Sequence, residues 1–353
     1  MPLLNQSSFP CFTCLSCHKG IPNTLDRFCQ NCGVALPSIR QPSRSDQSAS
    51  DQSEYVRSPQ VAGITNRGFW HSKNEDAIAI ECLGNGRTLM VVCDGVSSSA
   101  KPEAASEVAA QATAQALHQT GGQSPCQAIV QAIGQAQIAV SSLAPVAPEN
   151  PPSTTIVAAL VDPNSPCPTA TIGWIGDSRA YWLSPTEAKL LTEDDSWINW
   201  VRTHGQLPDH PAFDYPARSQ GCSQVFSQGF SDDEGGATVA GVDLETVIQH
   251  FATSPYAHAI TRWLGARKSS LENDLVPDTT PSIVQVPLQE EGFLILCSDG
   301  LWNYVSQPDR LLKVLDGQPQ ENALTIAQNL VNHALRCGGH DNVSVAVFYQ
   351  SSR

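Results

Sequence analysis

The sequence predicts a mixed α+β domain preceded by a small metal-binding module. From about residue 60 onward, short apolar runs of strand length alternate with alanine-rich segments of helical composition. Five cysteines crowd into the first 32 residues, and a stretch rich in serine and glutamine separates them from the rest of the chain. At 353 residues, the chain is expected to form one large domain or two unequal ones.

Strands and helices are both expected in the larger part. Five apolar runs have strand length and composition: 88–93, 155–161, 170–175, 292–297 and 343–348. Segments 102–119 and 124–141 are rich in alanine and glutamine and carry no proline after their first positions, as expected of helices. Apolar residues within 323–335 recur at the spacing of an amphipathic helix. The less regular stretch 203–258 is interpreted as an insertion or flap.

The charge of the chain argues against several classes of protein. Lys and Arg number 20 against 34 Asp and Glu, a net charge of −14, whereas binders of nucleic acid or anionic membranes need clustered cations. The 41% apolar content suffices for a full core. No run approaches the roughly 20 apolar residues of a membrane span, and the N-terminus does not resemble a signal peptide. We therefore expect a cytoplasmic protein without a membrane partner.

The dense cysteine cluster predicts a zinc ribbon over residues 10–37. Four cysteines form two C-x₂-C pairs separated by eleven residues: Cys14 with Cys17, and Cys29 with Cys32. Four thiolates on two tight turns can close a tetrahedral shell around one structural Zn²⁺. The pattern resembles the zinc-ribbon family, although Cys11 leaves a shifted pairing open. The other seven cysteines are scattered, which is typical of a reducing cytoplasm.

Residues 38–58 are interpreted as a flexible linker. Seven of these 21 residues are serine and three are glutamine, with few apolar side chains to bury. Up to residue 58 there are 5 basic and 4 acidic residues, a charge of +1, so the remainder carries −15. The acidity therefore belongs to the large domain, 59–352.

Acidic residues recur at the ends of apolar runs in this domain. The motifs are Asn74-Glu75-Asp76, Asp94-Gly95, Gly176-Asp177, Asp299-Gly300 and Asp341-Asn342. One aspartate before a glycine is usually a turn residue. Several such carboxylates in one domain repel each other, and no matching set of Lys or Arg accompanies them. Divalent cations are their natural counter-charge.

These residues also carry a family resemblance. The ordered motifs are Thr65-Asn66-Arg67-Gly68, Asn74-Glu75-Asp76, Cys93-Asp94-Gly95, Ser153-Thr154-Thr155, Gly176-Asp177-Ser178-Arg179, Leu191-Thr192, Ile260-Thr261-Arg262 with Gly265, Ser298-Asp299-Gly300-Leu301-Trp302 and Asp341-Asn342. Over roughly residues 60–350 the chain resembles metal-dependent protein phosphatases of the 2C type. The resemblance implies a four-layer αββα sandwich of two antiparallel sheets flanked by helices, with a Mg²⁺ or Mn²⁺ site at one end.

The resemblance implies a role for each motif. Asp94 would bridge two metals, with the carbonyl of Gly95 as a further ligand. Asp299 and Asp341 would complete the shell of the first metal, so Asp94, Asp299 and Asp341 are the expected catalytic residues.

The remaining acidic residues are expected around the other metals. Glu75 and Asp76 would hold the second metal directly or through waters, and Asp177 matches a position associated with a third, weaker metal. A hydroxide bridging two cations would attack the phosphorus of phosphoserine or phosphothreonine in line. No cysteine lies in a recognisable phosphate-cradling loop, so a cysteine-based mechanism is not expected.

Three positions depart from the family pattern. His71 stands where an arginine usually contacts substrate phosphate, and Arg67 is the candidate to compensate. His71 could equally be a polar strand residue. Residues 96–99 lack the usual Gly-Gly or His, and Asp195 stands where a histidine is common.

We predict a metal-dependent serine/threonine phosphatase that acts on phosphoproteins and is regulated or targeted by the zinc ribbon through a docking partner. The three departures keep open a pseudophosphatase, a folded interaction module with little or no turnover. A third hypothesis makes the ribbon a nucleic-acid adaptor, against which the −15 of the larger part counts.

Overall fold

A computed structural model describes the chain in ten stretches: residues 12–13, 20–21, 52–84, 86–119, 123–143, 150–163, 167–204, 259–265, 279–315 and 322–351. The chain divides into two compact units, of which residues 194–261 form the smaller. In the smaller unit the structure describes helix α3, Trp197–His204, preceded by a bridge between Ser196 and Ile260.

A six-stranded antiparallel sheet forms one half of the larger unit. Its order is β11-β10-β14-β15-β4-β3. The strands span β3 Gln52–Ser58, β4 Val61–Asn66, β10 Arg179–Leu183, β11 Ala188–Leu190, β14 Gly292–Cys297 and β15 Val343–Gln350. The two strands with the longest apolar runs, β14 and β15, occupy the centre, where both of their faces are buried.

A five-stranded antiparallel sheet forms the other half, in the order β13-β9-β8-β6-β5. The strands span β5 Asp76–Cys82, β6 Thr88–Asp94, β8 Ile156–Asp162, β9 Thr169–Ile175 and β13 Ser282–Pro287. Two short strands, β7 Ser153–Thr154 and β12 Leu264–Gly265, pair beside it.

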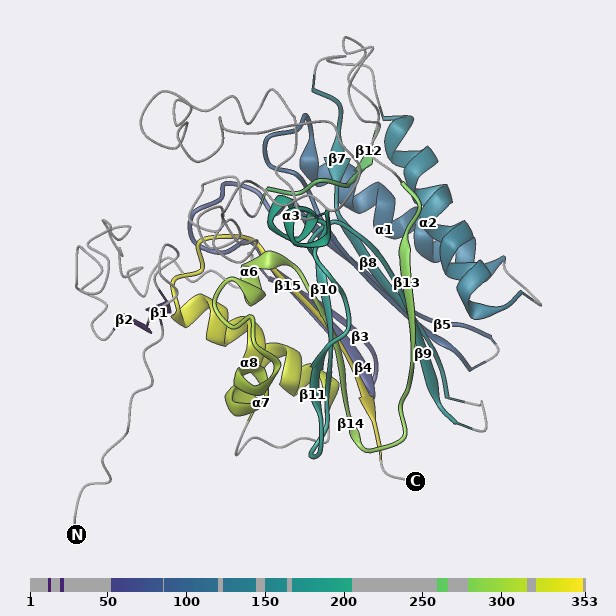
Figure 1. Ribbon diagram of the computed structural model, residues 1–353, viewed down its shortest axis with the longest axis vertical. Coiled ribbons are helices and arrows are strands. Elements are labelled where there is room, and N and C mark those ends of the chain that lie inside the picture. The colour runs from purple at the N-terminus through teal and green to yellow at the C-terminus, as the bar shows by residue number, and fades with distance from the viewer. Residues whose placement is uncertain are drawn as a thin grey trace, which may run out of the picture. The chain divides into compact units, whose positions relative to one another are not determined.

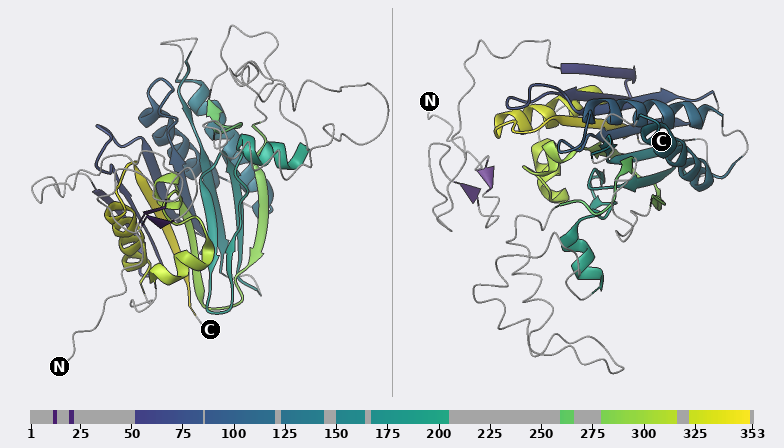
Figure 2. Two further views of the ribbon diagram at one scale, coloured as in Figure 1. Left: turned by 60° about the vertical axis from the view of Figure 1, so that its left-hand side comes forward. Right: turned by 90° about the horizontal axis from the view of Figure 1, so that it is seen from above.

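Helices cover the outer face of each sheet (Figure 1). The helices α1 Pro102–His118 and α2 Pro125–Ser141 pack on the five-stranded sheet. The helices α6 Asp299–Trp302, α7 Pro308–Leu315 and α8 Ala323–Arg336 pack on the six-stranded sheet. The side chains of β6 show how the layers form: Val91 faces α1 and α2, whereas Met90 and Val92 face the other sheet. The four-layer αββα sandwich expected from the family resemblance is confirmed (Figure 2).

Sequence signals explain where the helices begin. The hydroxyl of Ser124 accepts a hydrogen bond from the backbone N–H of Gln127, and Pro125 takes the first position of α2, where no N–H is needed. Asn322 caps α8 in the same way through the N–H of Leu324 at 2.9 Å. All five apolar runs predicted as strands, and all three predicted helices, are present within a few residues of their expected bounds.

One boundary predicted from the sequence is wrong. The sequence predicts residues 52–58 as part of the flexible linker, but they form β3, the edge strand beside β4. None of these side chains is fully buried. The segment is therefore mostly polar and lacks the apolar pattern by which a strand is predicted from sequence. The side chain of Arg57 anchors β3 to the other sheet by donating to the carbonyl of Ile80 at 2.8 Å.

The structure describes little of the N-terminal module. Phe12–Thr13 (β1) pairs with Gly20–Ile21 (β2) as a two-stranded antiparallel ladder. The predicted zinc ligands Cys14, Cys17, Cys29 and Cys32 lie outside the described residues, as does most of the predicted flap, 205–258. Among the helices that the structure describes, none is long and apolar enough to span a bilayer.

Candidate active site

The strand topology collects the acidic motifs at one end of the sandwich. Asp94 ends β6, and Asp76 begins the neighbouring strand β5, so the antiparallel register places the two residues directly opposite each other. Asp299 follows β14, and Asp341 precedes β15, the adjacent strand. Carboxylates that face each other across a ladder repel, and this arrangement is therefore costly without a counter-charge.

Asp76 is buried in a network of hydroxyl groups. It is 8% exposed, and the hydroxyl of Ser298 donates to its Oδ2 at 2.8 Å. The backbone N–H of Ser344 donates to the hydroxyl of Ser298, and the hydroxyl of Ser344 donates to Thr65 Oγ1 at 2.7 Å. Burial and the charges of Asp299 and Asp341 nevertheless raise the pKa of Asp76 to about 7.

Asp94 and Asp299 show the same effect. Burial, together with the charges of Asp76 and Asp299, raises the pKa of Asp94 well above its usual range. Burial and the charge of Asp341 raise the pKa of Asp299 to about 7, although hydrogen bonds from Asp94 and Asn303 partly offset the rise. In the described part of the chain, no lysine or arginine forms an ion pair with these three residues.

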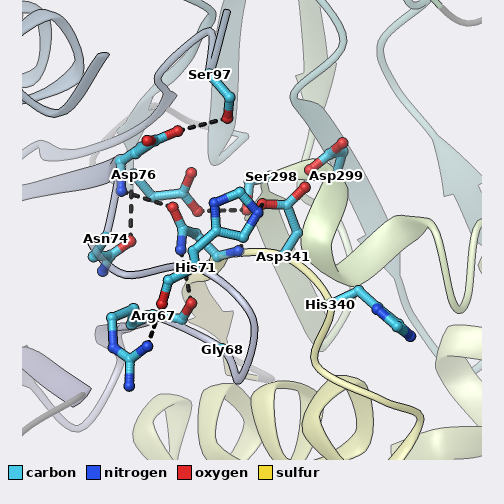
Figure 3. Close-up of polar contacts among 12 residues, drawn as sticks. Arg67, Gly68, His71, Asn74, Asp76, Ser97, Ser298, Asp299, His340 and Asp341 are labelled. Carbon is cyan, nitrogen blue, oxygen red and sulfur yellow. Dashed lines mark hydrogen bonds and ion pairs between the residues drawn. The ribbon is translucent and has the colours of Figure 1, made fainter. Parts of the chain in front are cut away.

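His71 lies in the loop between β4 and β5 rather than in a strand, so the alternative interpretation as a polar strand residue is wrong. Its Nε2 lies 3.2 Å from Oδ1 of Asp341, whose side chain is 41% exposed (Figure 3). Nη1 of Arg67 donates to the backbone carbonyl of His71. The two predicted phosphate-binding residues are thus joined to each other, and His71 is joined to the acidic cluster.

Asn342 is a site residue that sequence reasoning named only as part of a motif. Its side chain is 2% exposed and makes three hydrogen bonds to the loop that carries His71. It accepts from the N–H of Glu75 at 2.7 Å and donates to the carbonyls of Arg67 at 2.7 Å and Lys73 at 3.1 Å. Its partners lie nearly 270 positions away in sequence, and only the fold brings them together.

Glu75 is held by residues from three other segments. The hydroxyl of Ser97 donates to its Oε2 at 2.5 Å, so a residue of the atypical 96–99 stretch orients this carboxylate. The carbonyl of Glu75 accepts from the N–H of Gly95 at 3.1 Å and from the hydroxyl of Ser106 at 2.5 Å. At Gly95 a Cβ would lie 2.7 Å from the same carbonyl, which explains the glycine after Asp94.

Asp177 lies in the turn between β9, which ends at Ile175, and β10. The indole N–H of Trp302 donates to its carbonyl at 2.9 Å, linking this turn to the helix that begins at Asp299. The guanidinium of Arg179 lies 3.9 Å from the centre of the Trp302 ring. The charge of Asp177 contributes to the raised pKa of Asp94, so Asp177 belongs electrostatically to the cluster.

The chemistry of this donor set fits hard divalent cations. Carboxylate and carbonyl oxygens are the ligands of Mg²⁺ and Mn²⁺, and buried carboxylates with raised pKa values gain most from a cation. As they stand, no three Asp, Glu, His or Cys side chains within the described ranges already have metal-holding geometry. Binding would therefore require side-chain movement, which the repulsion among ionised carboxylates favours.

Comparison with known proteins identifies the family. The sequence model of the family described as protein phosphatase 2C matches residues 71–336, more than half of the chain. The chain belongs to the protein phosphatase 2C family. The family predicted from the sequence motifs is thereby confirmed. A plant relative, protein phosphatase 2C 57 of Arabidopsis thaliana, is 36% identical over 90 residues. That match spans 24% of this chain and 23% of the relative's length.

Solved structures of phosphatases share the 2C-type fold. A serine/threonine phosphatase of Staphylococcus aureus superposes with a TM-score of 0.59 at 21% identity, covering 85% of this chain and 98% of its own. The serine/threonine phosphatase PstP of Mycobacterium tuberculosis gives 0.57 at 22% identity, covering 83% and 98%. A PstP catalytic domain solved with two manganese ions gives 0.56 at 22% identity, covering 85% and 100%.

Proposed function

We propose that this protein is a metal-dependent serine/threonine phosphatase that hydrolyses phosphoserine and phosphothreonine in phosphoproteins. The observation that carries the proposal is the cluster of Asp76, Asp94 and Asp299, whose pKa values are all raised and which form no ion pair with a lysine or arginine among the described residues. Family membership and the two manganese ions in the PstP structure support the same conclusion.

Two Mg²⁺ or Mn²⁺ ions are proposed at this cluster. Asp94 would be a ligand of both ions, with the carbonyl of Gly95 as a further ligand. Asp299 and Asp341 would hold the first ion, and Asp76 would act in the shell of the second. Glu75 would join Asp76 there, and Asp177 would serve a third, weaker site. When bound, the ions supply an activated water as nucleophile and offset the charge of the phosphate.

The chain's own side chains would bind and orient the substrate. His71, fixed by Asp341, and Arg67, fixed by the carbonyl of His71, are proposed to contact the phosphate. Asn342 and Ser97 would keep the loop and Glu75 in place. The hydrogen bonds from Ser298 and Asn303 would orient the carboxylates of Asp76 and Asp299 toward the reacting end of the sandwich.

The proposal is tested by hydrolysis of a phosphothreonine peptide with MnCl₂. We expect Asp94→Asn and Asp299→Asn to lower kcat/KM by at least about 100-fold, because each removes a charge that the cations need. Asp309→Asn, at an exposed position in α7, is the matched control and should retain wild-type turnover. Unchanged turnover in both Asp94→Asn and Asp299→Asn would disprove this mechanism.

A pseudophosphatase is the second candidate, and one observation favours it. Asp341, a proposed metal ligand, already pairs with His71, which stands where the family usually has an arginine. Calorimetry with Mn²⁺, run beside the peptide assay, separates the two functions. Metal binding that Asp94→Asn abolishes, without turnover of any phosphosubstrate, would select the pseudophosphatase.

We also propose that Cys14, Cys17, Cys29 and Cys32 hold one structural Zn²⁺ in a ribbon that docks or regulates the phosphatase in the cytoplasm. The β1–β2 pairing brackets the first cysteine pair in sequence. Elemental analysis should find one zinc per chain. Cys17→Ser should lose it and Cys11→Ser should retain it; the reverse result would establish the shifted pairing of Cys11 with Cys14.

A further inference from the structure

A stacked aromatic pair lies beside the proposed reaction site. The rings of Trp70 and His340 lie 4.9 Å apart between centroids with an interplanar angle of 16°. Each residue immediately precedes one member of the His71–Asp341 pair. In Figure 3 the side chain of Asp341 points toward the other carboxylates, whereas the ring of His340 points away from them. We call the Trp70–His340 pair the aromatic shelf.

The shelf is held rigidly by its backbone. The N–H of Phe69 donates to the carbonyl of Gly339 at 2.8 Å, and the N–H of His340 donates to the hydroxyl of Tyr304 at 2.9 Å. A Cβ at Gly68 would lie 2.2 Å from the carbonyl of Asp341, so the two loops are in direct contact. A ring fixed before binding loses little conformational entropy when a ligand covers it.

Trp70 remains accessible although one partner ring covers part of it. It is 49% exposed and is one of four large apolar residues classed as exposed among those described; the others are Val56, Val130 and Ile138. Exposing an indole to water is unfavourable in free energy, and burying it in a core would avoid this cost.

The charge around the shelf indicates which residue it accepts. The part of the chain after residue 58 carries a net −15, which favours a cationic over an anionic side chain on the shelf. An indole is the best ring for a cation, and an acidic surface draws cations toward it. The same chain already stacks a guanidinium on an indole at Arg179 and Trp302.

We propose that the aromatic shelf selects phosphoprotein substrates that carry an arginine close to the phosphorylated residue, with the guanidinium stacked on Trp70. This inference rests on the proposed phosphatase function, whose substrates it narrows. Phosphate at the carboxylate cluster and arginine at the shelf would together fix the peptide at two points of opposite charge.

Matched phosphothreonine peptides test the proposal. Arginine, citrulline or alanine is placed in turn at each of three positions on either side of the phosphothreonine; citrulline keeps the planar shape of arginine without its charge. With MnCl₂ at low salt, we expect at least one position at which arginine raises kcat/KM about fivefold over both replacements. Equal values for arginine and citrulline would overturn the proposed cation recognition.

Variants at Trp70 assign the preference to the shelf. Trp70→Leu keeps apolar bulk but removes the ring, so the arginine-to-alanine ratio should fall below about twofold, whereas Trp70→Phe should keep part of it. Ile138→Ala, at another exposed apolar residue, is the control and should keep the wild-type ratio. A ratio that Trp70→Leu leaves unchanged would overturn the proposal. Melting temperatures of the variants show whether the fold is retained.

Two further measurements separate failure of this inference from failure of the proposed function. Absence of p-nitrophenyl phosphate turnover with Mn²⁺ would contradict the phosphatase function alone, because this small substrate carries no arginine. Fluorescence anisotropy of labelled peptides then still measures the arginine preference, since binding needs no turnover. Turnover of p-nitrophenyl phosphate with equal affinity for all peptides would overturn only the shelf.

Discussion

At the scale of single residues, small polar side chains position the larger charged ones. Ser298 holds Asp76, Ser97 holds Glu75, and the carboxamide of Asn342 holds the loop that carries His71. Removing one partner of a buried hydrogen bond costs more free energy than the intact bond contributes to stability, because the other partner is left unpaired and away from water. These residues are therefore the ones whose replacement is expected to affect both stability and substrate binding.

Replacing Asn342 with alanine removes three hydrogen bonds at once. We expect the free energy of unfolding to fall by about 2–4 kcal/mol, because the carbonyls of Arg67 and Lys73 and the N–H of Glu75 lose their partner. Urea unfolding measures this change. Asn150→Ala removes one exposed bond to the carbonyl of Ser98 and should cost under about 1 kcal/mol. Equal losses in the two variants would contradict the role given to Asn342.

Sequence showed the acidic residues but not their partners. Asp94, Asp299 and Asp341 were predicted because each stands at the end of an apolar run, a pattern that is local in sequence. The contact of His71 with Asp341 and that of Ser97 with Glu75 join distant segments, and no spacing rule indicates them. The proposed metal-binding roles of these residues stay predictions until the metal is measured.

At the scale of elements, buried strands and helices are predictable from their sequence pattern, whereas exposed ones are not. The strand β14 is buried along its whole length, and its sequence is an apolar run that predicts a strand. The strand β3 lies at a sheet edge with mostly exposed side chains, and its sequence predicts a linker instead. Helix α2 is predicted from its alanine and glutamine content and its lack of interior proline, and in the structure Ile129 and Ile133 face the five-stranded sheet.

A glycine inside α2 and a glycine in the strand that α2 covers should respond oppositely to an added methyl group. At Gly134, inside α2, an added Cβ meets nothing within 4 Å, so Gly134→Ala should stabilise the protein by about 0.5–1 kcal/mol. At Gly173 in β9, the Cβ would lie 2.4 Å from Cγ2 of Ile129, and Gly173→Ala should cost about 1–3 kcal/mol. Chemical denaturation of both variants checks the pair, and shifts of the same sign would contradict this packing.

At the scale of the whole molecule, several of the chain's acidic residues lie together at one end of the sandwich. Burial and, to a smaller extent, the charges of neighbouring aspartates raise the pKa values of Asp76 and Asp299 to about 7. Between the unfolded value of about 4 and pH 7, the folded protein therefore binds more protons than the unfolded chain. Stability without added divalent cation should fall as the pH rises through this range.

Cations should reverse this trend, because they bind the ionised carboxylates. We expect MnCl₂ to raise the melting temperature more at pH 7.5 than at pH 5.5, with an effect of several degrees at the higher pH. Scanning calorimetry at both pH values, with and without MnCl₂, measures it. The Asp94→Asn variant should lose most of the gain. A gain that is the same at both pH values, or is kept by that variant, would contradict the proposed cation site.

The place of β15 in the sheet has a consequence for biosynthesis. This strand follows every other described element in the sequence, yet it lies between β14 and β4, and Asp341 directly precedes it. A nascent chain still lacking residues 341–350 has neither the central strand of one sheet nor a complete set of acidic residues. The proposed catalytic site can therefore assemble only after β15 has left the ribosome, and any shorter nascent chain should be inactive toward phosphoproteins.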